Sequence, residues 1–214
     1  RGWSRRLLIP LALTLWTLWR LQVSAALLGL AAAAVLSLPL LFPRRRKAMC
    51  LLSVLLVAAS LGFVWCFPGG SATLAELHQL LHGQADVSFG SGRLAIWRAL
   101  LPLAAERPLL GGGCGTLYLR DLESFYWYRG GETIHVAITS AHNEYLGILV
   151  DQGVLALLAF LALLALALHQ AFRYAESDRY AVAGTALICY AVMAFFSVAT
   201  CITDVFLWLL LALL

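Results

Sequence analysis

Charged side chains are scarce in this chain of 214 residues. Lys, Arg, Asp and Glu make up only 12% of it, whereas soluble domains carry about 25% charged residues. Hydrophobic residues make up 62%, and the mean hydropathy is +0.87. This composition excludes an ordinary soluble domain and predicts an integral membrane protein. The pI near 9.0 does not indicate nucleic-acid binding, because the basic residues lie in short clusters beside apolar runs.

Motifs for metals and redox thiols are also lacking. The five cysteines form no CxxC pair, so neither a zinc centre nor a thiol-redox centre is expected. Cys66 and Cys114 could both lie outside the cytoplasm and pair there, but we expect them to pack as unpaired thiols. His78 and His82 are four residues apart with Glu76 nearby, yet no third ligand follows at a suitable spacing. We therefore predict no metal site.

Long apolar runs are what the chain does have, and a membrane helix needs about 20 such residues. We predict a polytopic transmembrane helical bundle of the all-α class. Because the chain begins with Arg1 and ends inside an apolar run, we expect a fragment of a longer protein, and no cleavable signal peptide is evident. The predicted spans are about 3–19, 21–42 and 48–67, then 145–168, 180–200 and a truncated 205–214.

Basic clusters orient these predicted spans. Arg44-Arg45-Arg46-Lys47 lies between two of them, and Arg173 and Arg179 lie between two others. Lys and Arg accumulate in cytoplasmic loops, so both clusters should be cytoplasmic. The polar stretch 68–144 is then outside the cytoplasm. It holds seven carboxylates and five arginines, so it lacks the basic excess of a cytoplasmic loop.

Short helices are expected within this stretch. Leu74–Leu81 and Leu94–Ala105 have apolar residues at helical spacing. Leu109–Gly115 is a glycine-rich turn, and it is not a Walker loop because no Gly-Lys-Ser/Thr follows. Tyr118–Thr139 contains aromatic and β-branched residues without a clean period, and we predict an irregular segment there.

Two polar groups of this stretch could carry chemistry. Arg93 begins an amphipathic helix that also presents Trp97, and a guanidinium binds phosphate oxygens in bidentate fashion. The simpler alternative is an arginine that snorkels to lipid headgroups. His142 can exchange a proton near neutral pH, as a general base must, and Asn143 and Glu144 could orient its ring or bind sugar hydroxyls. The simpler alternative there is a helix cap that faces headgroups.

Three further features stay open at the level of the sequence. Arg20 interrupts an apolar stretch on the predicted outer side, where it either binds an anionic partner or anchors a hairpin at the interface. Gly111 and Gly113 belong to a segment whose amides could bind an anion, or which simply allows close packing. Asp204 lies either in a loop or in a buried polar contact.

Taken together, the motifs resemble those of the O-antigen ligase and O-antigen polymerase superfamily of bacterial envelope proteins. The resemblance covers about Arg93–Leu161 and reads R-x-x-x-W, P-L-x-G-x-G, A-H-N-x-Y-L and D-x-G, in that order. Weaker similarity extends upstream, where family members carry an arginine at the outer end of a span, then a returning span and a basic turn. Arg20 fits this pattern, although the usual preceding serine is Trp19 here.

The resemblance implies a GT-C-like glycosyltransferase of the bacterial inner membrane, with its active-site loop in the periplasm. The donor would be an undecaprenyl-diphosphate-linked glycan, and no metal or other cofactor is implied. Ligases of the family use lipid A core as acceptor, polymerases extend another lipid-linked glycan, and other relatives glycosylate proteins; we favour a ligase. The implied catalytic residues are His142 and Arg93, and the implied substrate-binding residues are Arg20, Trp97, Asn143, Glu144, Gly111 and Gly113.

Two other classes of membrane protein fit the sequence less well. A transporter or flippase for lipid-linked glycan would also need outward arginines, but it should carry polar residues deep within several spans. The predicted spans are nearly free of them. A non-catalytic scaffold would leave the clustering of Arg93, His142 and Asn143 on one side unexplained.

Overall fold

A computed structural model describes residues 8–21, 23–70, 72–84, 89–120, 122, 125–129, 132–198 and 200–214. These residues form nine α-helices, two short 3-10 helices and one β-hairpin. In chain order the elements are α1 (Leu8–Leu21), α2 (Ser24–Leu36), α3 (Leu38–Leu41), η2 (Pro43–Arg45), α4 (Arg46–Cys66), α5 (Ala72–Leu81), α6 (Phe89–Glu106), η3 (Leu117–Leu119), β1 (Phe125–Arg129), β2 (Glu132–Val136), α7 (Glu144–Arg173), α8 (Asp178–Ala194) and α9 (Cys201–Leu213).

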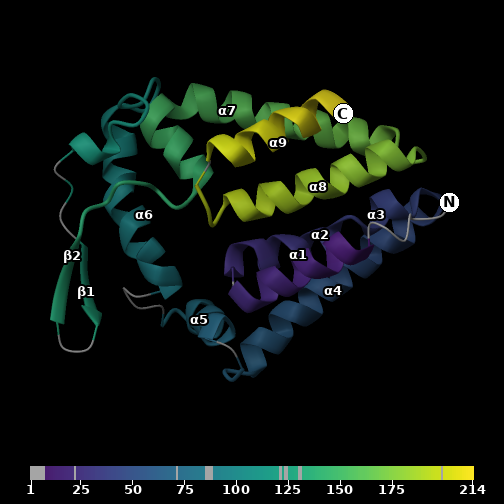
Figure 1. The fold of residues 1–214 in the computed structure, drawn as a ribbon, viewed down its shortest axis with the longest axis horizontal. Helices are drawn as coiled ribbons and strands as arrows, with labels where there is room; N and C mark the ends of the chain where they lie inside the picture. The colour runs from purple at the N-terminus through teal and green to yellow at the C-terminus, as the bar shows by residue number, and fades with distance from the viewer. Residues whose placement is uncertain are drawn as a thin grey trace.

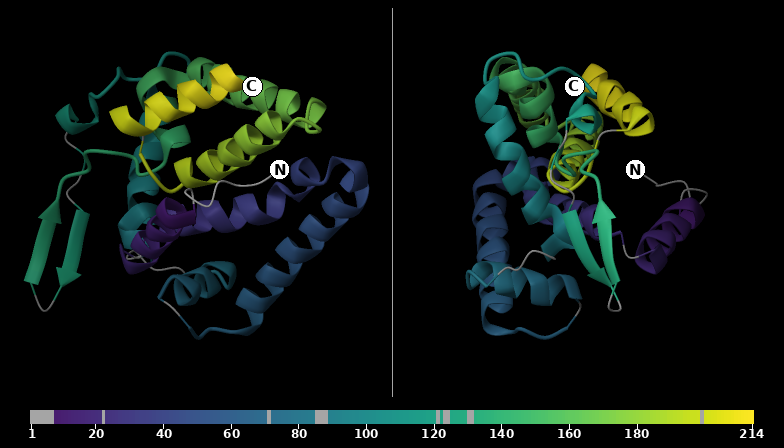
Figure 2. Two further views of the ribbon diagram at one scale, coloured as in Figure 1. Left: turned by 45° about the vertical axis from the view of Figure 1, so that its right-hand side comes forward. Right: turned by 90° about the vertical axis from the view of Figure 1, so that its left-hand side faces the viewer.

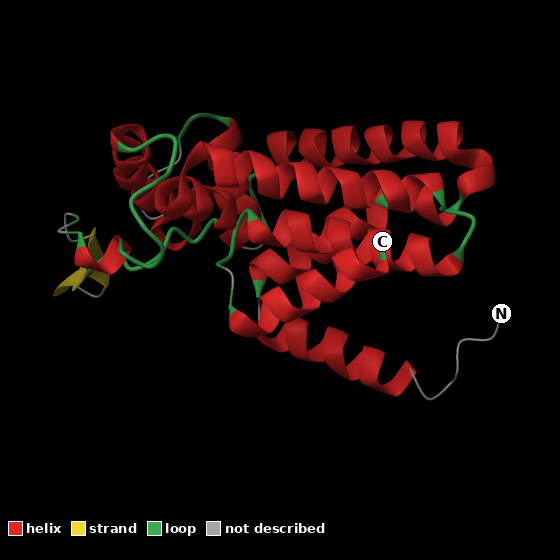
Figure 3. Cartoon of the chain, turned by 90° about the horizontal axis from the view of Figure 1, so that it is seen from above, coloured by secondary structure: helices red, strands yellow, loops and turns green. Residues whose placement is uncertain are grey.

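Long helices lie side by side in a bundle, and α8 packs between α2 and α7 (Figure 1). Helices α5 and α6 close one end of this bundle, and the hairpin projects from the same end (Figure 3). Helix α1 leans away from the others (Figure 2) and has no buried residue.

Small residues let the central helices approach closely, as they do in membrane bundles. A Cβ added at Gly29 of α2 would lie 2.9 Å from the carbonyl oxygen of Cys189 on α8. A Cβ added at Gly184 of α8 would lie 2.6 Å from the Cβ of Ala171 on α7. The close packing of α2, α8 and α7 therefore requires that these two positions carry no side chain.

Two described helices are long and apolar enough to cross a membrane: Pro43–Cys66 and Glu144–Arg173. They coincide with the predicted spans 48–67 and 145–168. Shorter apolar helices occupy Leu8–Leu21, Ser24–Leu36 and Thr203–Leu213. The division of the chain into spans and one outer loop, and the direction in which each span crosses, stay predictions.

The predicted span 21–42 is divided in the structure. Helix α2 ends at Leu36, and the short α3 begins at Leu38. Pro39 explains the break, because proline has no N–H to donate and its ring clashes with the carbonyl four residues earlier. The predicted span 180–200 is likewise shorter, since α8 ends at Ala194.

Both helices predicted in the polar stretch are confirmed as α5 and α6, with α6 beginning earlier, at Phe89. The prediction of an irregular segment over Tyr118–Thr139 was wrong. Strands β1 and β2 pair antiparallel there, with Arg129 opposite Glu132. Aromatic and β-branched residues favour strands, and the two residues between the strands are both glycine in the sequence, which is a hairpin signal.

Candidate functional site

Trp97 joins α6 to the segment that leads into α7. Its Nε1 donates a hydrogen bond to the carbonyl oxygen of Ala141 at 2.9 Å. Its ring meets that of Phe195 edge to face, with 5.5 Å between the centroids. Trp97 thereby holds the residue immediately before His142 against α6 and against the end of α8.

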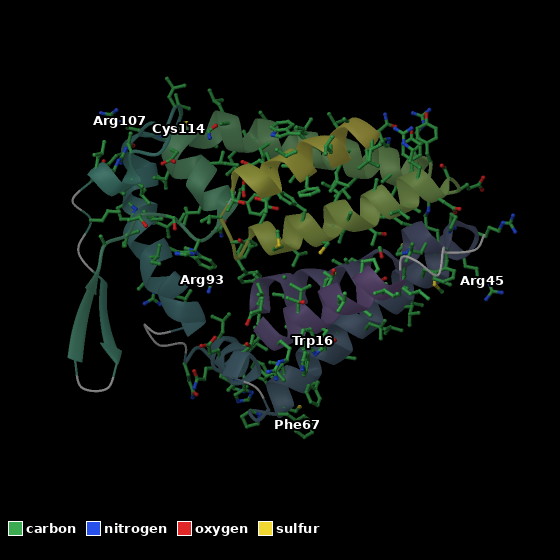
Figure 4. All side chains as sticks on the ribbon, in the orientation of Figure 1. Trp16, Arg45, Phe67, Arg93, Arg107 and Cys114 are labelled. Atoms are coloured by element: carbon green, nitrogen blue, oxygen red, sulfur yellow. The ribbon has the colours of Figure 1, made fainter. Side chains whose placement is uncertain are left out.

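Arg93 lies one turn before Trp97 and therefore on the same face of α6. The guanidinium is half-buried, and its Nε donates to the carbonyl oxygen of Phe196 at 3.2 Å. Nη1 donates to the carbonyl of Gly90. Burial lowers the pKa of Arg93 below its usual value, while the charge on Glu76 of α5 acts in the opposite direction. Figure 4 shows Arg93 at the end of the bundle where α6 lies.

His142 has a backbone conformation that sets it apart. Its φ is +47°, and it is the one residue other than glycine with positive φ in the described ranges. Such conformations are uncommon and concentrate at functional positions. The His142 side chain is exposed, and partial desolvation lowers the pKa of its imidazole below the usual range; the positive charge on Arg93 lowers this pKa further. The side chains of His142 and Arg93 therefore lie within electrostatic range of each other.

Asn143 and Glu144 begin α7. The Oδ1 of Asn143 accepts a hydrogen bond from the backbone N–H of Leu146 at 3.0 Å, so the helix-cap interpretation is confirmed for this residue. Glu144 is half-buried in the first turn, where burial and the nearby charge on Asp204 raise the pKa of its carboxyl to about 6. Substrate binding by either residue stays a prediction.

The glycine-rich segment docks on a break in α7. At the break Gly153 has φ of +82°, and the helical hydrogen-bond ladder is interrupted. The segment replaces the missing bonds: Gly112 N–H donates to Val150 O, and Gly113 N–H donates to Asp151 O, both at 2.8 Å. Val154 N–H donates to Pro108 O at 2.7 Å. The exposed backbone groups of the break are thus satisfied by the segment.

Only glycine fits on either side of this joint, the contact between the glycine-rich segment and the break in α7. A Cβ added at Gly153 would lie 2.2 Å from the carbonyl oxygen of Leu109, and one at Gly111 would lie 2.4 Å from the carbonyl carbon of Asp151. Asp151 also accepts a hydrogen bond from Gly115 N–H at 3.1 Å through its Oδ2. The P-L-x-G-x-G and D-x-G motifs are therefore two halves of one backbone contact.

Both amides that we predicted for anion binding already donate hydrogen bonds to backbone carbonyls. Gly111 N–H donates to Arg107 O at 2.9 Å, and Gly113 N–H donates to Asp151 O. Neither amide is free to bind a substrate phosphate. For Gly111 and Gly113 the structure instead gives the close packing that the sequence left as the alternative.

Arg20 lies in the last turn of α1 and is exposed. The start of α2 contacts α5, because the hydroxyl oxygens of Ser24 and Thr73 are 3.3 Å apart. The C-terminal end of α1, which carries Arg20, lies at the end of the bundle closed by α5 and α6 (Figure 1). None of the described residues hydrogen-bonds or forms an ion pair with its guanidinium.

Sequence reasoning missed a cavity of about 620 Å³ beside the start of α7, where Asn143 and Glu144 lie. Its polar lining includes Asn143, Glu144, Asp151 and Asp204, and its apolar lining includes Phe160 and Trp208. The open question about Asp204 is answered: it lies in the first turn of α9 and faces this cavity. A carboxylate at the start of an otherwise apolar helix was the available signal.

Metal-ligating side chains do not converge in the described part of the chain, where no group of three or more His, Cys, Asp or Glu could hold an ion. The ring centroids of His78 and His82 lie 4.1 Å apart, with the rings tilted by 35° to each other. The Nδ1 atoms of the two rings contact backbone carbonyl oxygens at 2.7 and 2.9 Å. Cys66 and Cys114 are free, exposed thiols.

A family model described as O-antigen ligase matches residues 9–161, which is more than half of the chain. The chain belongs to the O-antigen ligase family. The resemblance found in the sequence is thereby confirmed, and the matched range contains Arg20, Arg93, the glycine-rich segment and His142. Comparisons with curated proteins and with solved structures gave no match. Family membership makes this a membrane glycosyltransferase of the ligase or polymerase type.

Proposed function

We propose that this O-antigen ligase family member transfers a glycan from undecaprenyl diphosphate to an acceptor hydroxyl at the periplasmic face of the inner membrane. One observation carries the proposal. Arg93 and His142 come from separate motifs, with the glycine-rich segment and the hairpin between them in the chain. Trp97, one turn from Arg93 on α6, nevertheless hydrogen-bonds Ala141, the residue before His142, and the charge on Arg93 lowers the pKa of His142.

Arg93 would stabilise the charge that develops on the leaving pyrophosphate. Two backbone carbonyls hold its guanidinium through Nε and Nη1, and none of the described residues accepts a hydrogen bond from Nη2. A cation that is already oriented and half-buried stabilises a transition state more than a mobile, hydrated one. Arg20, exposed at the same end, would contact the second phosphate.

His142 would act as the general base. The acceptor oxygen attacks the anomeric carbon, its proton passes to a ring nitrogen of His142, and the bond from that carbon to the diphosphate oxygen breaks. The products are the glycosylated acceptor and undecaprenyl diphosphate, with inversion at the anomeric centre. A pKa below the usual range keeps His142 neutral near pH 7 and therefore able to accept the proton.

Within the family we favour a ligase with lipid A core as acceptor, and polymerisation or protein glycosylation are the alternatives. Deletion of the gene followed by gel profiling of surface polysaccharide separates them. Loss of long glycan from lipid A core, with lipid-linked polymer accumulating, identifies a ligase. Single-repeat glycan identifies a polymerase, and altered glycoproteins with unchanged polysaccharide identify a protein glycosyltransferase.

The same deletion tests the alternative of a flippase. A flippase mutant would accumulate lipid-linked glycan on the cytoplasmic face, whereas a transferase mutant accumulates it on the periplasmic face. A deletion strain with normal polysaccharide and normal glycoproteins would contradict the proposed function altogether.

A further inference from the structure

The cavity beside the start of α7 has a lining that does not suit the diphosphate of the proposed donor. Glu144, Asp151 and Asp204 all face it, and Glu144 and Asp204 lie close enough to interact electrostatically. None of the described residues forms an ion pair with any of the three. A diphosphate would be repelled by these carboxylates, so the donor phosphates belong with Arg93 and not in the cavity.

The cavity nevertheless has the character of a ligand site. Apolar walls with a few polar groups at one end are typical of small-molecule pockets, and its volume falls within their usual range. Trp208 lines it from α9 although its side chain is 58% exposed. An exposed aromatic ring beside carboxylates suits a sugar, which has an apolar face and a rim of hydroxyl donors.

Asn143 gives an independent indication of a ligand. Its side chain is only 6% exposed and lines the cavity. Oδ1 is used to cap α7, but none of the described residues accepts a hydrogen bond from Nδ2. Because Asn143 lines the cavity and its Nδ2 keeps two N–H donors for a partner, a sugar hydroxyl in the cavity would be a suitable acceptor.

The position of the cavity relates it to His142. Ala141 and Asn143, which flank His142 in the chain, both line it. A sugar bound there would have its hydroxyls beside the segment that carries the proposed base, while Arg93 approaches this segment from α6.

We propose that this cavity is the acceptor subsite and that it binds a sugar without negative charge through Glu144, Asp204 and Asn143. Carboxylates accept hydrogen bonds from sugar hydroxyls and would also bind the ammonium of an amino sugar. The assignment as acceptor subsite rests on the proposed function, whereas the binding of an uncharged sugar can be measured without any transfer.

The test uses the whole protein purified in detergent, with glucose, glucosamine and glucuronic acid at millimolar concentration as probes in saturation-transfer NMR. Glucose and glucosamine should bind, and glucuronic acid should bind more weakly. Asp204→Asn should weaken glucose binding about tenfold, since a hydrogen bond to a charged group is lost. Glu144→Gln should act in the same direction, and both variants should lose more affinity for glucosamine than for glucose.

Two controls locate the effect. Glu176→Gln makes the same chemical change at an exposed carboxylate in the α7–α8 turn and should leave sugar binding unchanged. Arg93→Ala should leave glucose binding unchanged but weaken binding of undecaprenyl diphosphate. If Asp204→Asn unfolds, Trp208→Ala provides the second variant, because its exposed side chain can be removed without opening a core.

The outcomes separate the two proposals. If purified protein transfers no glycan but Asp204→Asn weakens glucose binding, the sugar site stands and the proposed function fails. If transfer proceeds while neither Asp204→Asn nor Glu144→Gln changes glucose binding, the subsite is overturned and the proposed function stands. Loss of undecaprenyl diphosphate binding in both carboxylate variants would also overturn the subsite, by placing the donor in the cavity.

Discussion

Arginines gather at both ends of the helical bundle, and the two ends use them differently. Figure 4 shows Arg45 at one end and Arg93 at the other. At the Arg45 end, the exposed Arg46 donates to Phe172 O at 2.6 Å through Nη2. The exposed Arg179 donates to Leu213 O at 2.9 Å through Nη2 and at 3.1 Å through Nε. These arginines neutralise helix C-termini, where a cation is stabilising.

Arg93 also donates to backbone carbonyls, but its surroundings differ. It is half-buried, its pKa is lowered by that burial, and it acts on a titratable neighbour, His142. The carbonyl contacts are common to both ends and so do not mark a site. Burial together with a titratable neighbour is what distinguishes the Arg93 end.

The largest expected effect is on transfer, through His142. Replacing it with alanine removes the proposed base, and general-base catalysis contributes about 10²–10⁴-fold to a rate. The initial rate of glycan transfer by purified protein should fall by that factor, with protein level and thermal unfolding unchanged. His169→Ala on α7, a histidine outside the proposed site, is the matched control and should keep the wild-type rate. An equal loss of transfer rate in His142→Ala and His169→Ala would contradict a specific role for the Arg93 end of the bundle.

The next effect is on stability, through the joint between the glycine-rich segment and α7. Gly153→Ala forces a side chain into positive φ and against Leu109 O, and backbone strain alone costs about 1–3 kcal/mol. We expect thermal unfolding in detergent at clearly lower temperature and loss of transfer. Gly62→Ala in α4 is the control, since nothing lies within 4 Å of the added Cβ. It should be neutral or slightly stabilising.

The pH profile gives a smaller effect with a definite sign. A general base works only when neutral, so transfer should fall as pH drops through the pKa of His142. Because that pKa lies below its usual range, the acid-side half-loss should occur below about pH 6.5. Arg93→Gln removes a positive charge near His142. The pH at which the residual activity of this variant falls to half should therefore be higher than in the wild-type protein. Wild-type activity that already falls to half well above pH 6.5 would contradict the pairing of His142 with Arg93.

The smallest effect concerns Trp97. Trp97→Phe keeps an aromatic ring near Phe195 but loses the hydrogen bond to Ala141 O, which is worth about 0.5–1.5 kcal/mol. Transfer should fall several-fold, with kcat affected more than the KM for the donor, because the bond positions His142. A change in donor KM alone would instead indicate direct substrate contact by Trp97.

Much of the fold follows from local patterns in the sequence. The apolar runs identify α4 and α7, and helical spacing identifies α5 and α6. The break at Ser37 was missed although Pro39 provides the signal, because hydropathy does not register a missing N–H. The hairpin was missed because Tyr118–Thr139 has no clean period, although the glycine pair between its strands is a hairpin signal.

The site was predictable in its residues but not in its contacts. Arg93 and His142 could be named from their motifs, yet their proximity depends on how α6 packs against α7. The role of Gly111 depends on a break in α7 that Gly153 permits. The sequence of each motif alone does not reveal that P-L-x-G-x-G and D-x-G contact each other. The cavity is likewise formed by residues from distant segments.

The most direct test of the account compares Arg93→Lys with Arg46→Lys in the deletion strain, by gel profiling of surface polysaccharide at matched protein level. Lysine keeps the charge but loses the planar guanidinium that binds phosphate in bidentate fashion. Arg93→Lys should leave the glycan defect largely uncorrected, because removing one oriented group that stabilises the transition state costs about 10²–10³-fold. Arg46→Lys should restore the wild-type profile. Full restoration by Arg93→Lys, or equal failure of both variants, would contradict the claim that Arg93 and His142 form the transfer site.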